Sequence, residues 1–270
     1  MNKEQTIDFK QAVHDFWDEK TCGTWEVDKE KFTKEYFEEI EETRYRLQPE
    51  IFTFAEFTRF HGKKVLEVGV GAGTDFLQWV RAGADASGID LTEQAIEHVR
   101  HRLELYNLKP GELHVSDCEQ LPFPDNFFDL VYSWGVIHHT PDTKKALDEI
   151  VRVCKPGGIC KIMIYHRNSL LAWFFWIKRA LLKGKPFQTI SKVLSEQMES
   201  YGTKAYTVSE AKKILEKYNL YEIRIQPVLT YYDKLERQGG FLSFIAKSTA
   251  WLLGGDRVGW FLTIQFKKRG

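Results

Sequence analysis

Three glycines at alternate positions, Gly69, Gly71 and Gly73, could bring the backbone close to a ligand. Glycine has no Cβ, so it allows a sharp turn and a close approach. The glycines follow a short apolar run and precede a helical pattern. A loop between a strand and a helix presents backbone amides at the carboxyl end of the first strand of an open parallel sheet. The ligand could be a dinucleotide, a nucleotide phosphate or another molecule that contains adenosine.

The residues around the glycines narrow these alternatives. The dinucleotide fingerprint G-x-G-x-x-G would place its last glycine at position 74, which is Thr74. No lysine follows the glycines, as a phosphate-binding Walker A loop requires. Glu67, two residues before the first glycine, is unfavourable beside a pyrophosphate but suits a ligand that carries positive charge. The loop therefore favours a cationic ligand.

Two further carboxylates lie at the ends of predicted strands. Residues 84–90 read as a strand that ends at Asp90, near the spacing of about 20 residues at which an acid reaches ribose hydroxyls. The alternative for Asp90 is a helix-capping or solvent-facing role. Thr92 is a suitable cap for the helix that follows. A third strand, residues 113–117, ends at Asp117.

The run that begins at Asp117 carries a family resemblance. Its sequence, D-C-E-Q-L-P-F-P-D-N-F-F-D-L-V, is similar to the D-A-x-x-L-P-F-P-D-x-S-F-D-x-V signature of class I S-adenosylmethionine-dependent methyltransferases. This family includes ubiquinone- and menaquinone-type C-methyltransferases and many small-molecule enzymes. The pattern E-x-G-x-G-x-G from Glu67, the acid Asp90 and the run R-V-C-K-P-G-G at 152–158 resemble further motifs of the family. The resemblance covers about residues 60 to 165.

The resemblance implies S-adenosyl-L-methionine as cofactor, S-adenosyl-L-homocysteine as product, and roles for the matching residues. The methionine part would contact the loop, the ribose diol Asp90, and the adenine Asp117 with Cys118. The end of the fourth strand would flank the sulfonium and its methyl group. The expected cofactor contacts are Glu67, Gly69, Gly71, Gly73, Thr74, Asp90, Leu91, Asp117, Cys118, Ser133 and Trp134.

Two adjacent histidines, His138 and His139, follow the fourth strand, where the methyl acceptor should approach. One of them could act as a general base or orient the acceptor. Alternatively, one could bond the backbone and shape the loop. A metal site is not expected, because adjacent histidines rarely point at one ion without further carboxylates.

Aromatic segments outside the motifs are expected to form the acceptor pocket. Residues 5–19 and about 29–47 read as helices that could close over the ligand loop. Residues 170–182 form an apolar helix with a basic end, which is too short to span a bilayer. This helix could lie on a membrane surface or cover the site as a lid, and a second apolar insertion after residue 240 favours the lid. The expected pocket residues are Trp17, Tyr36, Tyr45, His166, Trp173 and Trp176.

The composition of the 270 residues fits a reduced, cytoplasmic enzyme. Thirty-eight basic residues balance 38 acidic ones, so the overall charge gives no support for a nucleic-acid partner. The four cysteines show neither C-x-x-C spacing nor a disulfide framework. The start lacks the apolar core of a signal peptide, and no apolar run approaches the roughly 20 residues of a membrane span. The sequence does not indicate an oligomeric state.

The predicted fold is α/β, a Rossmann-like three-layer sandwich with a mostly parallel seven-stranded sheet. The resemblance implies that the last strand is antiparallel. We expect one methyltransferase domain over 1–270. Its parts are a helical cap (1–60), a cofactor-binding core (61–166), lid insertions (167–206 and 229–257) and the rest of the sheet (207–228 and 258–270).

The expected reaction is methyl transfer to a small, apolar or aromatic acceptor by in-line attack on the sulfonium methyl. The alternatives are a non-catalytic sensor or scaffold that binds the cofactor or its product, and a methyltransferase acting on a membrane lipid or quinone. An NAD-dependent oxidoreductase is disfavoured by Thr74 and by the lack of a Tyr-x-x-x-Lys pair. The Asn/Asp-Pro-Pro-Tyr/Phe motif of nucleic-acid methyltransferases is absent, since the corresponding residues are S-W-G-V at 133–136.

Overall fold

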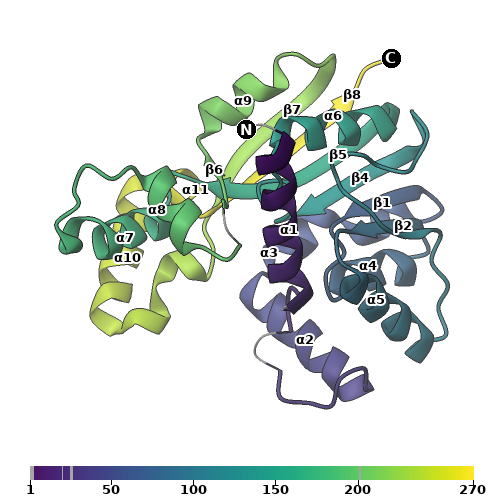
Figure 1. Cartoon of the computed structure of the whole chain (residues 1–270), viewed down its shortest axis with the longest axis horizontal. Coiled ribbons are helices and arrows are strands. Elements are labelled where there is room, and N and C mark those ends of the chain that lie inside the picture. The colour runs from purple at the N-terminus through teal and green to yellow at the C-terminus, as the bar shows by residue number, and fades with distance from the viewer. Residues whose placement is uncertain (1–2, 20, 25–26, 201) are drawn as a thin grey trace.

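A mixed β-sheet forms the centre of the computed structural model, which describes residues 3–19, 21–24, 27–200 and 202–270 (Figure 1). Seven strands lie in the order β3-β2-β1-β4-β5-β8-β7, and the short β6 pairs with the end of β5. The strands are β1 (Lys64–Val68), β2 (Asp85–Asp90), β3 (Leu113–Val115), β4 (Phe128–Trp134), β5 (Cys154–His166), β6 (Ala205–Tyr206), β7 (Leu220–Val228) and β8 (Phe261–Lys268).

The sheet is mostly parallel. Strands β1 to β6 pair in parallel, whereas β8 runs antiparallel to both of its neighbours, β5 and β7. This confirms the predicted Rossmann-like fold, including the antiparallel last strand, and adds the two-residue β6. The strand order reverses between β1 and β4, and open α/β sheets bind ligands at such a switch point, outside the carboxyl ends of the strands.

Helices cover both faces of the sheet. The α-helices are α1 (Lys3–Glu19), α2 (Lys34–Leu47), α3 (Glu50–Ala55), α4 (Thr74–Arg81), α5 (Glu93–Leu105), α6 (Thr143–Val153), α7 (Leu170–Arg179), α8 (Ile190–Gln197), α9 (Val208–Leu215), α10 (Gly240–Leu253) and α11 (Gly255–Val258). Short 3₁₀ turns are η1 (Phe57–Phe60), η2 (Leu181–Lys183), η3 (Tyr232–Lys234) and η4 (Glu236–Gln238).

Alternation along the central strands produces two hydrophobic layers. Leu130 packs with α4 and α5 on one face, while its neighbour Val131 packs with α6 and α9 on the other. Successive strand residues point to opposite faces, so a strand that is buried on both sides is apolar throughout. The helices on the two faces thus pack against β1 and β4, which are neighbours in the sheet. The loops that follow these two strands therefore lie close together.

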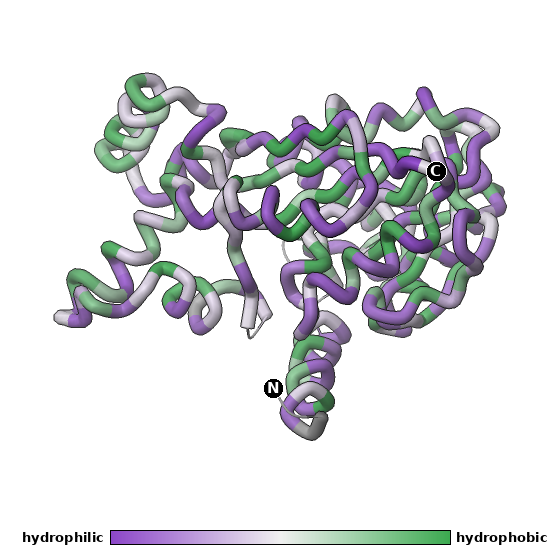
Figure 2. Tube along the Cα trace, turned by 90° about the horizontal axis from the view of Figure 1, so that it is seen from above, coloured by the Kyte–Doolittle hydropathy of each residue, from purple (hydrophilic) through white to green (hydrophobic). Residues whose placement is uncertain are grey.

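Helices α7, α8, α10 and α11 form a separate group at the β6 end of the molecule, at the left of Figure 1. We call residues 170–197 and 240–258 the insertion lobe. In the view from above, the lobe projects away from the sheet, and its helices carry apolar stretches (Figure 2). Within the described part of the chain, no helix combines the length and apolar character needed to cross a membrane.

Candidate active site

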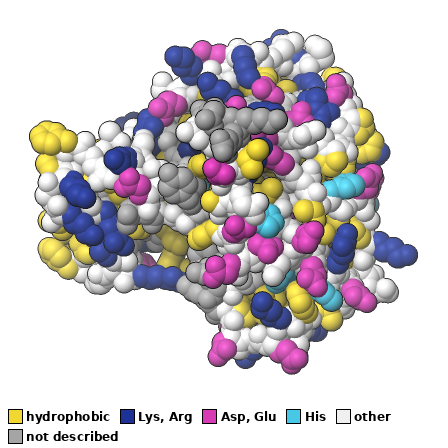
Figure 3. Space-filling model, viewed as in Figure 1, with side chains coloured by type: hydrophobic (Ala, Val, Ile, Leu, Met, Phe, Trp, Pro, Cys, Tyr) yellow, Lys and Arg dark blue, Asp and Glu magenta, His cyan; other side chains and the backbone are white. Residues whose placement is uncertain are grey.

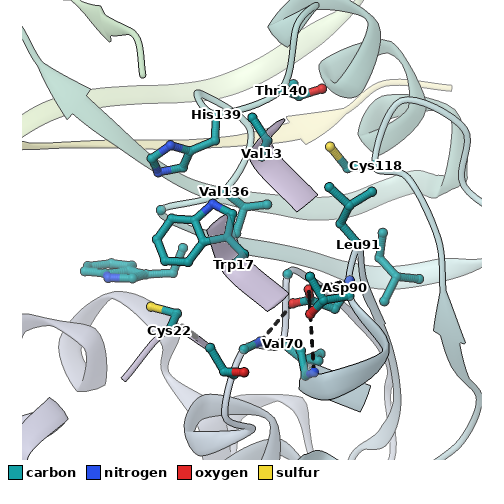
Figure 4. Close-up of a pocket in the computed structure, with 18 of the residues that line it drawn as sticks. Val13, Trp17, Cys22, Val70, Asp90, Leu91, Cys118, Val136, His139 and Thr140 are labelled. Carbon is teal, nitrogen blue, oxygen red and sulfur yellow. Dashed lines mark hydrogen bonds between the residues drawn. The ribbon is translucent and has the colours of Figure 1, made fainter. Parts of the chain in front are cut away.

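A pocket lies at the carboxyl ends of β1, β2 and β4, against α1 (Figure 4). Its volume is about 1040 Å³, including the part open to solvent, which suits a ligand of moderate size. The pocket is lined by residues from α1 and the turn after it, from the glycine loop, from the turns after β2 and β3, and from the loop after β4. The lining residues are Lys10, Val13, Trp17, Thr21, Cys22, Arg44, Gly69, Val70, Gly71, Ala72, Thr74, Asp75, Ile89, Asp90, Leu91, Thr92, Ala95, Ser116, Asp117, Cys118, Trp134, Gly135, Val136, His139, Thr140 and Pro141.

The glycine loop follows β1 with a left-handed backbone at each of its three glycines. At Gly69, where φ is 82°, an added Cβ would lie 2.2 Å from a methyl carbon of Val136. At Gly71 an added Cβ would lie 3.4 Å from the Cβ of Cys22, at the pocket wall. Gly73 is not in the lining. Its Cβ would meet Val99 of α5 at 2.9 Å, so this glycine allows close packing of α4 on α5.

Asp90, at the end of β2, lines the pocket and also holds the glycine loop. Its Oδ2 accepts a hydrogen bond from the Gly71 amide at 3.0 Å. Its Oδ1 accepts from the amide and the hydroxyl of Thr92 at 3.1 and 3.2 Å. Burial raises the pKa of Asp90, although these hydrogen bonds oppose the rise. Since a carboxylate oxygen has two lone pairs, Oδ2 can accept one more hydrogen bond from a ligand.

Asp117 lies at the rim of the pocket and joins the core to α1. Its Oδ2 pairs with Lys10 Nζ, and its Oδ1 accepts from the Glu119 amide at 2.8 Å. Lys10 also pairs with Glu119 Oε2 at 2.8 Å. The neighbouring thiol of Cys118 is protonated at neutral pH, because burial raises its pKa to about 12. Cys118 therefore contributes shape to the wall and no nucleophile.

A buried polar cluster lies near the start of α4. The guanidinium of Arg44 donates to both oxygens of Asp75, at 2.9 and 2.6 Å. The hydroxyls of Tyr45 and Tyr132 donate to the same carboxylate, at 3.2 and 3.0 Å. Arg44 and Asp75 line the pocket, but Tyr45, expected to line it, lies behind them.

Glu67 and Ser133 are also behind the lining, although both were expected to contact the cofactor. Each is buried, and Glu67 Oε2 and Ser133 Oγ have no hydrogen-bond partner among the described residues. Burial, and then the charge of Asp75, raise the pKa of Glu67 well above its ordinary value. Trp134, the next residue after Ser133, does line the pocket and donates its indole N–H to Gln48 Oε1 at 2.8 Å.

His139 lies in the pocket wall beside α1. Its Nδ1 is 2.8 Å from Ser200 Oγ and 3.0 Å from Thr203 Oγ1. Because the Thr203 hydroxyl donates to the Ser200 carbonyl at 2.7 Å, its oxygen accepts from a protonated Nδ1. This assigns the basic lone pair to Nε2, which has no hydrogen-bond partner in the described part of the chain and lies 3.5 Å from Glu199 Oε2.

Burial, followed by the charge of Lys204, lowers the pKa of His139 to about 3, so its ring is neutral near pH 7. The Trp17 ring packs edge-on beside it, with 5.3 Å between ring centroids (Figure 4). His138, in contrast, is fully buried and absent from the lining, and its ring packs against those of His139 and Tyr165. Across the residues that are described, no group of three or more His, Cys, Asp or Glu side chains could hold a metal ion.

Of the six aromatic residues expected in the acceptor pocket, Trp17 is the one that lines it. The others lie elsewhere because they have other partners. Tyr36 OH pairs with His98 Nε2 at 3.0 Å, and His166 Nδ1 lies 3.0 Å from the Gly259 carbonyl. Helix α7 packs on α8. Trp176 of α7 donates to the carbonyl of Gln188, just before α8, at 2.7 Å, and Trp173 is exposed.

Lining residues that were not predicted from the sequence include Lys10, Val13, Cys22 and Arg44. Lys10 and Val13 lie seven and four residues before Trp17, so the three side chains share one face of α1. That spacing could have identified them as a group, but it does not say which surface the helix covers. For Cys22 and Arg44 the local sequence carries no such signal.

Comparison with known proteins places these features in a family. Residues 66–162 match the family described as a methyltransferase domain. The chain is 31% identical over 180 residues to demethylmenaquinone methyltransferase of Bacillus cereus, an alignment that covers 62% of this chain and 73% of that protein. It is 35% identical over 98 residues to phosphatidylethanolamine N-methyltransferase of Cereibacter sphaeroides, covering 36% of this chain and 48% of that one. The chain thus spans about half the length of some curated relatives it matches.

A solved structure shares the fold. Phosphoethanolamine N-methyltransferase 2 of Haemonchus contortus, in complex with S-adenosyl-L-methionine, superposes with a TM-score of 0.60 at 18% identity. The match covers 96% of this chain and 60% of that chain.

Proposed function

The chain belongs to the class I S-adenosylmethionine-dependent methyltransferases, and from this membership we propose that it transfers the cofactor's methyl group to a small apolar or aromatic acceptor. The observation that carries this proposal is the neutral His139 beside apolar walls at the β4 end of the pocket. The relative named demethylmenaquinone methyltransferase supports an acceptor of this kind. The relative named phosphatidylethanolamine N-methyltransferase instead supports the alternative of a membrane lipid as acceptor.

The pocket residues fit the cofactor. Asp90 Oδ2 has acceptor capacity left for ribose hydroxyls. The ion pair of Arg44 and Asp75 offers both charges to the amino-acid end of the cofactor, and the unpartnered oxygen of Glu67 lies buried close by. When bound, the cofactor supplies a methyl group on a positively charged sulfur.

The residues of the chain would align the acceptor, exclude water and take up a proton. Val13, Trp17 and Val136 give an apolar surface that favours an uncharged acceptor and keeps water out. Alignment of two bound reactants removes much of the entropy cost of their encounter. Nε2 of His139 would accept the proton that the acceptor loses on methylation, while Ser200 and Thr203 fix the ring orientation.

Calorimetric titration with S-adenosylmethionine, S-adenosylhomocysteine and NAD tests the cofactor. Turnover is then measured as formation of S-adenosylhomocysteine with a demethylated quinol, a simple phenol and phosphatidylethanolamine in mixed micelles. Binding of NAD in place of S-adenosylmethionine would contradict the proposal. Cofactor binding without turnover of any acceptor would instead favour the non-catalytic alternative.

The role of His139 is tested by His139→Gln. We expect kcat to fall by about 10²–10⁴-fold, the usual contribution of general acid–base catalysis, with the Kd for S-adenosylmethionine unchanged. His114→Gln is the matched control, because His114 is on β3, outside the pocket lining. Equal kcat values for the two variants would exclude His139 as the base.

A further inference from the structure

We propose that the insertion lobe docks on the surface of a membrane that contains anionic lipids, through exposed apolar side chains of α7, η2 and α10. Eighteen large apolar side chains are exposed among the described residues, and twelve of them lie in segments 170–187 and 240–253. The six most exposed are all in these segments: Phe187 (98%), Trp251 (81%), Phe241 (77%), Leu182 (75%), Leu252 (71%) and Phe244 (69%). Large apolar side chains that gather on one part of a protein surface usually mark an interaction site.

Helix α10 has its small residues inside and its large ones outside. Its buried residues are Ser243, Ala246 and Ala250, whereas Phe244 and Trp251 extend into solvent. A helix on the surface of a water-soluble domain normally places its large apolar side chains toward the core. Lys247 is the helix's one charged residue, and its ammonium pairs with Glu236 at 2.8 Å. Helix α10 therefore presents an apolar outer face that water does not favour.

The lobe does not serve as a wall of the active-site pocket. None of its residues is among those that line the pocket, and Trp173 and Trp176 belong to α7, which packs on α8. The apolar side chains of the lobe therefore need a partner outside the described chain. Since no described helix could cross a membrane, the contact we propose lies at the membrane surface.

Basic residues beside the apolar side chains indicate the partner. Segment 170–187 contains four cations, Lys178, Arg179, Lys183 and Lys185, and no acidic residue. Figure 3 shows Lys and Arg side chains next to hydrophobic ones on the lobe, at the left of the view. Apolar and aromatic side chains flanked by cations are the combination that inserts into the headgroup region of an anionic bilayer.

A buried carboxylate helps to anchor the lobe to the sheet. Asp233 of η3 accepts from the Trp260 amide at 2.8 Å, the Thr230 amide at 2.9 Å and the Leu171 amide at 3.4 Å. These bonds join the start of α7 to η3 and to the residue before β8. Helix α7 is thus held by this carboxylate, and α10 packs on η3, which carries it. The proposed docking surface is built into the fold and does not depend on the identity of the methyl acceptor.

Sedimentation with vesicles tests this proposal directly with the full chain and without cofactor. We expect binding to vesicles of phosphatidylcholine mixed with phosphatidylglycerol, and weak binding to phosphatidylcholine alone. The combined change Leu182→Glu and Trp251→Glu should reduce binding by about tenfold or more, because it places charge in the headgroup boundary. The matched control, Leu105→Glu with Ile223→Glu, alters two exposed apolar residues outside the lobe and should bind like the wild type.

A second pair of variants tests the charges without changing the apolar surface. Lys183→Gln with Lys185→Gln should weaken binding to the anionic vesicles by about fivefold for each lysine. Lys144→Gln with Lys145→Gln, two exposed lysines of α6, should have no effect. The proposal is overturned if the wild type does not bind anionic vesicles. It is also overturned if the lobe variant with two glutamates binds them as well as its control with two glutamates outside the lobe. It is also overturned if sedimentation velocity shows a dimer that the lobe variant breaks, since the partner would then be a second copy.

Discussion

The carboxylate of Asp90 accepts a hydrogen bond from the backbone amide of Gly71, with 3.0 Å between Oδ2 and N. The acid at the end of β2 thus holds the loop that follows β1, the strand beside it. The residue expected to bind the ribose therefore has a second task within the fold. It shapes the glycine loop, and it keeps one acceptor position open toward the pocket.

Replacement of Asp90 should separate these tasks. Asp90→Ala removes the acceptor for Gly71 and Thr92 as well as the ligand contact, and hydrogen bonds to charged groups are each worth about 1.5–3 kcal/mol. We expect the affinity for S-adenosylmethionine to fall by at least about tenfold, with a larger loss than in Asp90→Asn, which keeps one acceptor oxygen. Calorimetry measures both. Asp129→Ala is the control, because Asp129 also accepts from a backbone amide, that of Lys64, but lies outside the pocket lining. Equal affinities of the Asp90→Ala and Asp129→Ala variants would contradict the prediction.

Gly69 should be more sensitive to substitution than another glycine with a similar backbone. Gly69→Ala would place a Cβ 2.2 Å from Val136, whereas Gly157, with φ of 78°, has no atom within 4 Å of its added Cβ. Both alanines carry the cost of a left-handed backbone, about 1–2 kcal/mol, but only Gly69→Ala adds overpacking of about 1–3 kcal/mol. Urea unfolding measures the difference, and Val136→Ala in the same chain should recover part of it. The steric account fails if the two glycine variants are equally stable.

The regular elements of the core could be predicted because their patterns are local. The expected strand 84–90 corresponds to β2, and Thr92 caps α5 by accepting from the Ala95 amide at 3.3 Å, as predicted. The alternation of apolar residues and the acids at strand ends depend only on neighbouring residues and on the shared carboxyl edge of parallel strands.

The remaining parts of the site depend on contacts between distant segments. The bond between Lys10 and Asp117 joins residues 107 positions apart, and no local pattern says that α1 covers that edge. Trp173 was expected in the pocket because its type suits an apolar wall. Residue type alone does not distinguish a wall of the pocket from an exposed surface. Trp173 is exposed because α7 packs on α8 and not beside the pocket.

Acidification should destabilise the fold through His139. Near pH 7 the ring is neutral in both the folded and the unfolded chain, so no stability is lost there. Below the ordinary pKa of 6.5 the unfolded chain takes up a proton, whereas burial keeps the folded ring neutral down to a pKa of about 3. The wild type therefore loses about 1.4 kcal/mol for each pH unit relative to His139→Asn. Urea unfolding at pH 7, 6 and 5 measures this change, with His114→Asn as the control; parallel curves for the wild type and His139→Asn would refute it.

Lys161 should contribute strongly to stability although it lies far from the chemistry. Its ammonium is fully buried in β5 and donates to the carbonyls of Phe54 and Ala55, at 2.5 and 3.2 Å, and to Glu56 Oε2 at 2.5 Å. These bonds satisfy the carboxyl end of α3, whose last carbonyls have no partner within the helix. Lys161→Met keeps the length of the side chain but leaves the carbonyls without a donor, so we expect a loss of about 1–3 kcal/mol in the free energy of unfolding. Lys217→Met removes a half-exposed ion pair with Asp148 and should cost at most about 1 kcal/mol. If urea unfolding gave the two variants the same stability, the buried lysine would not be the cap of α3.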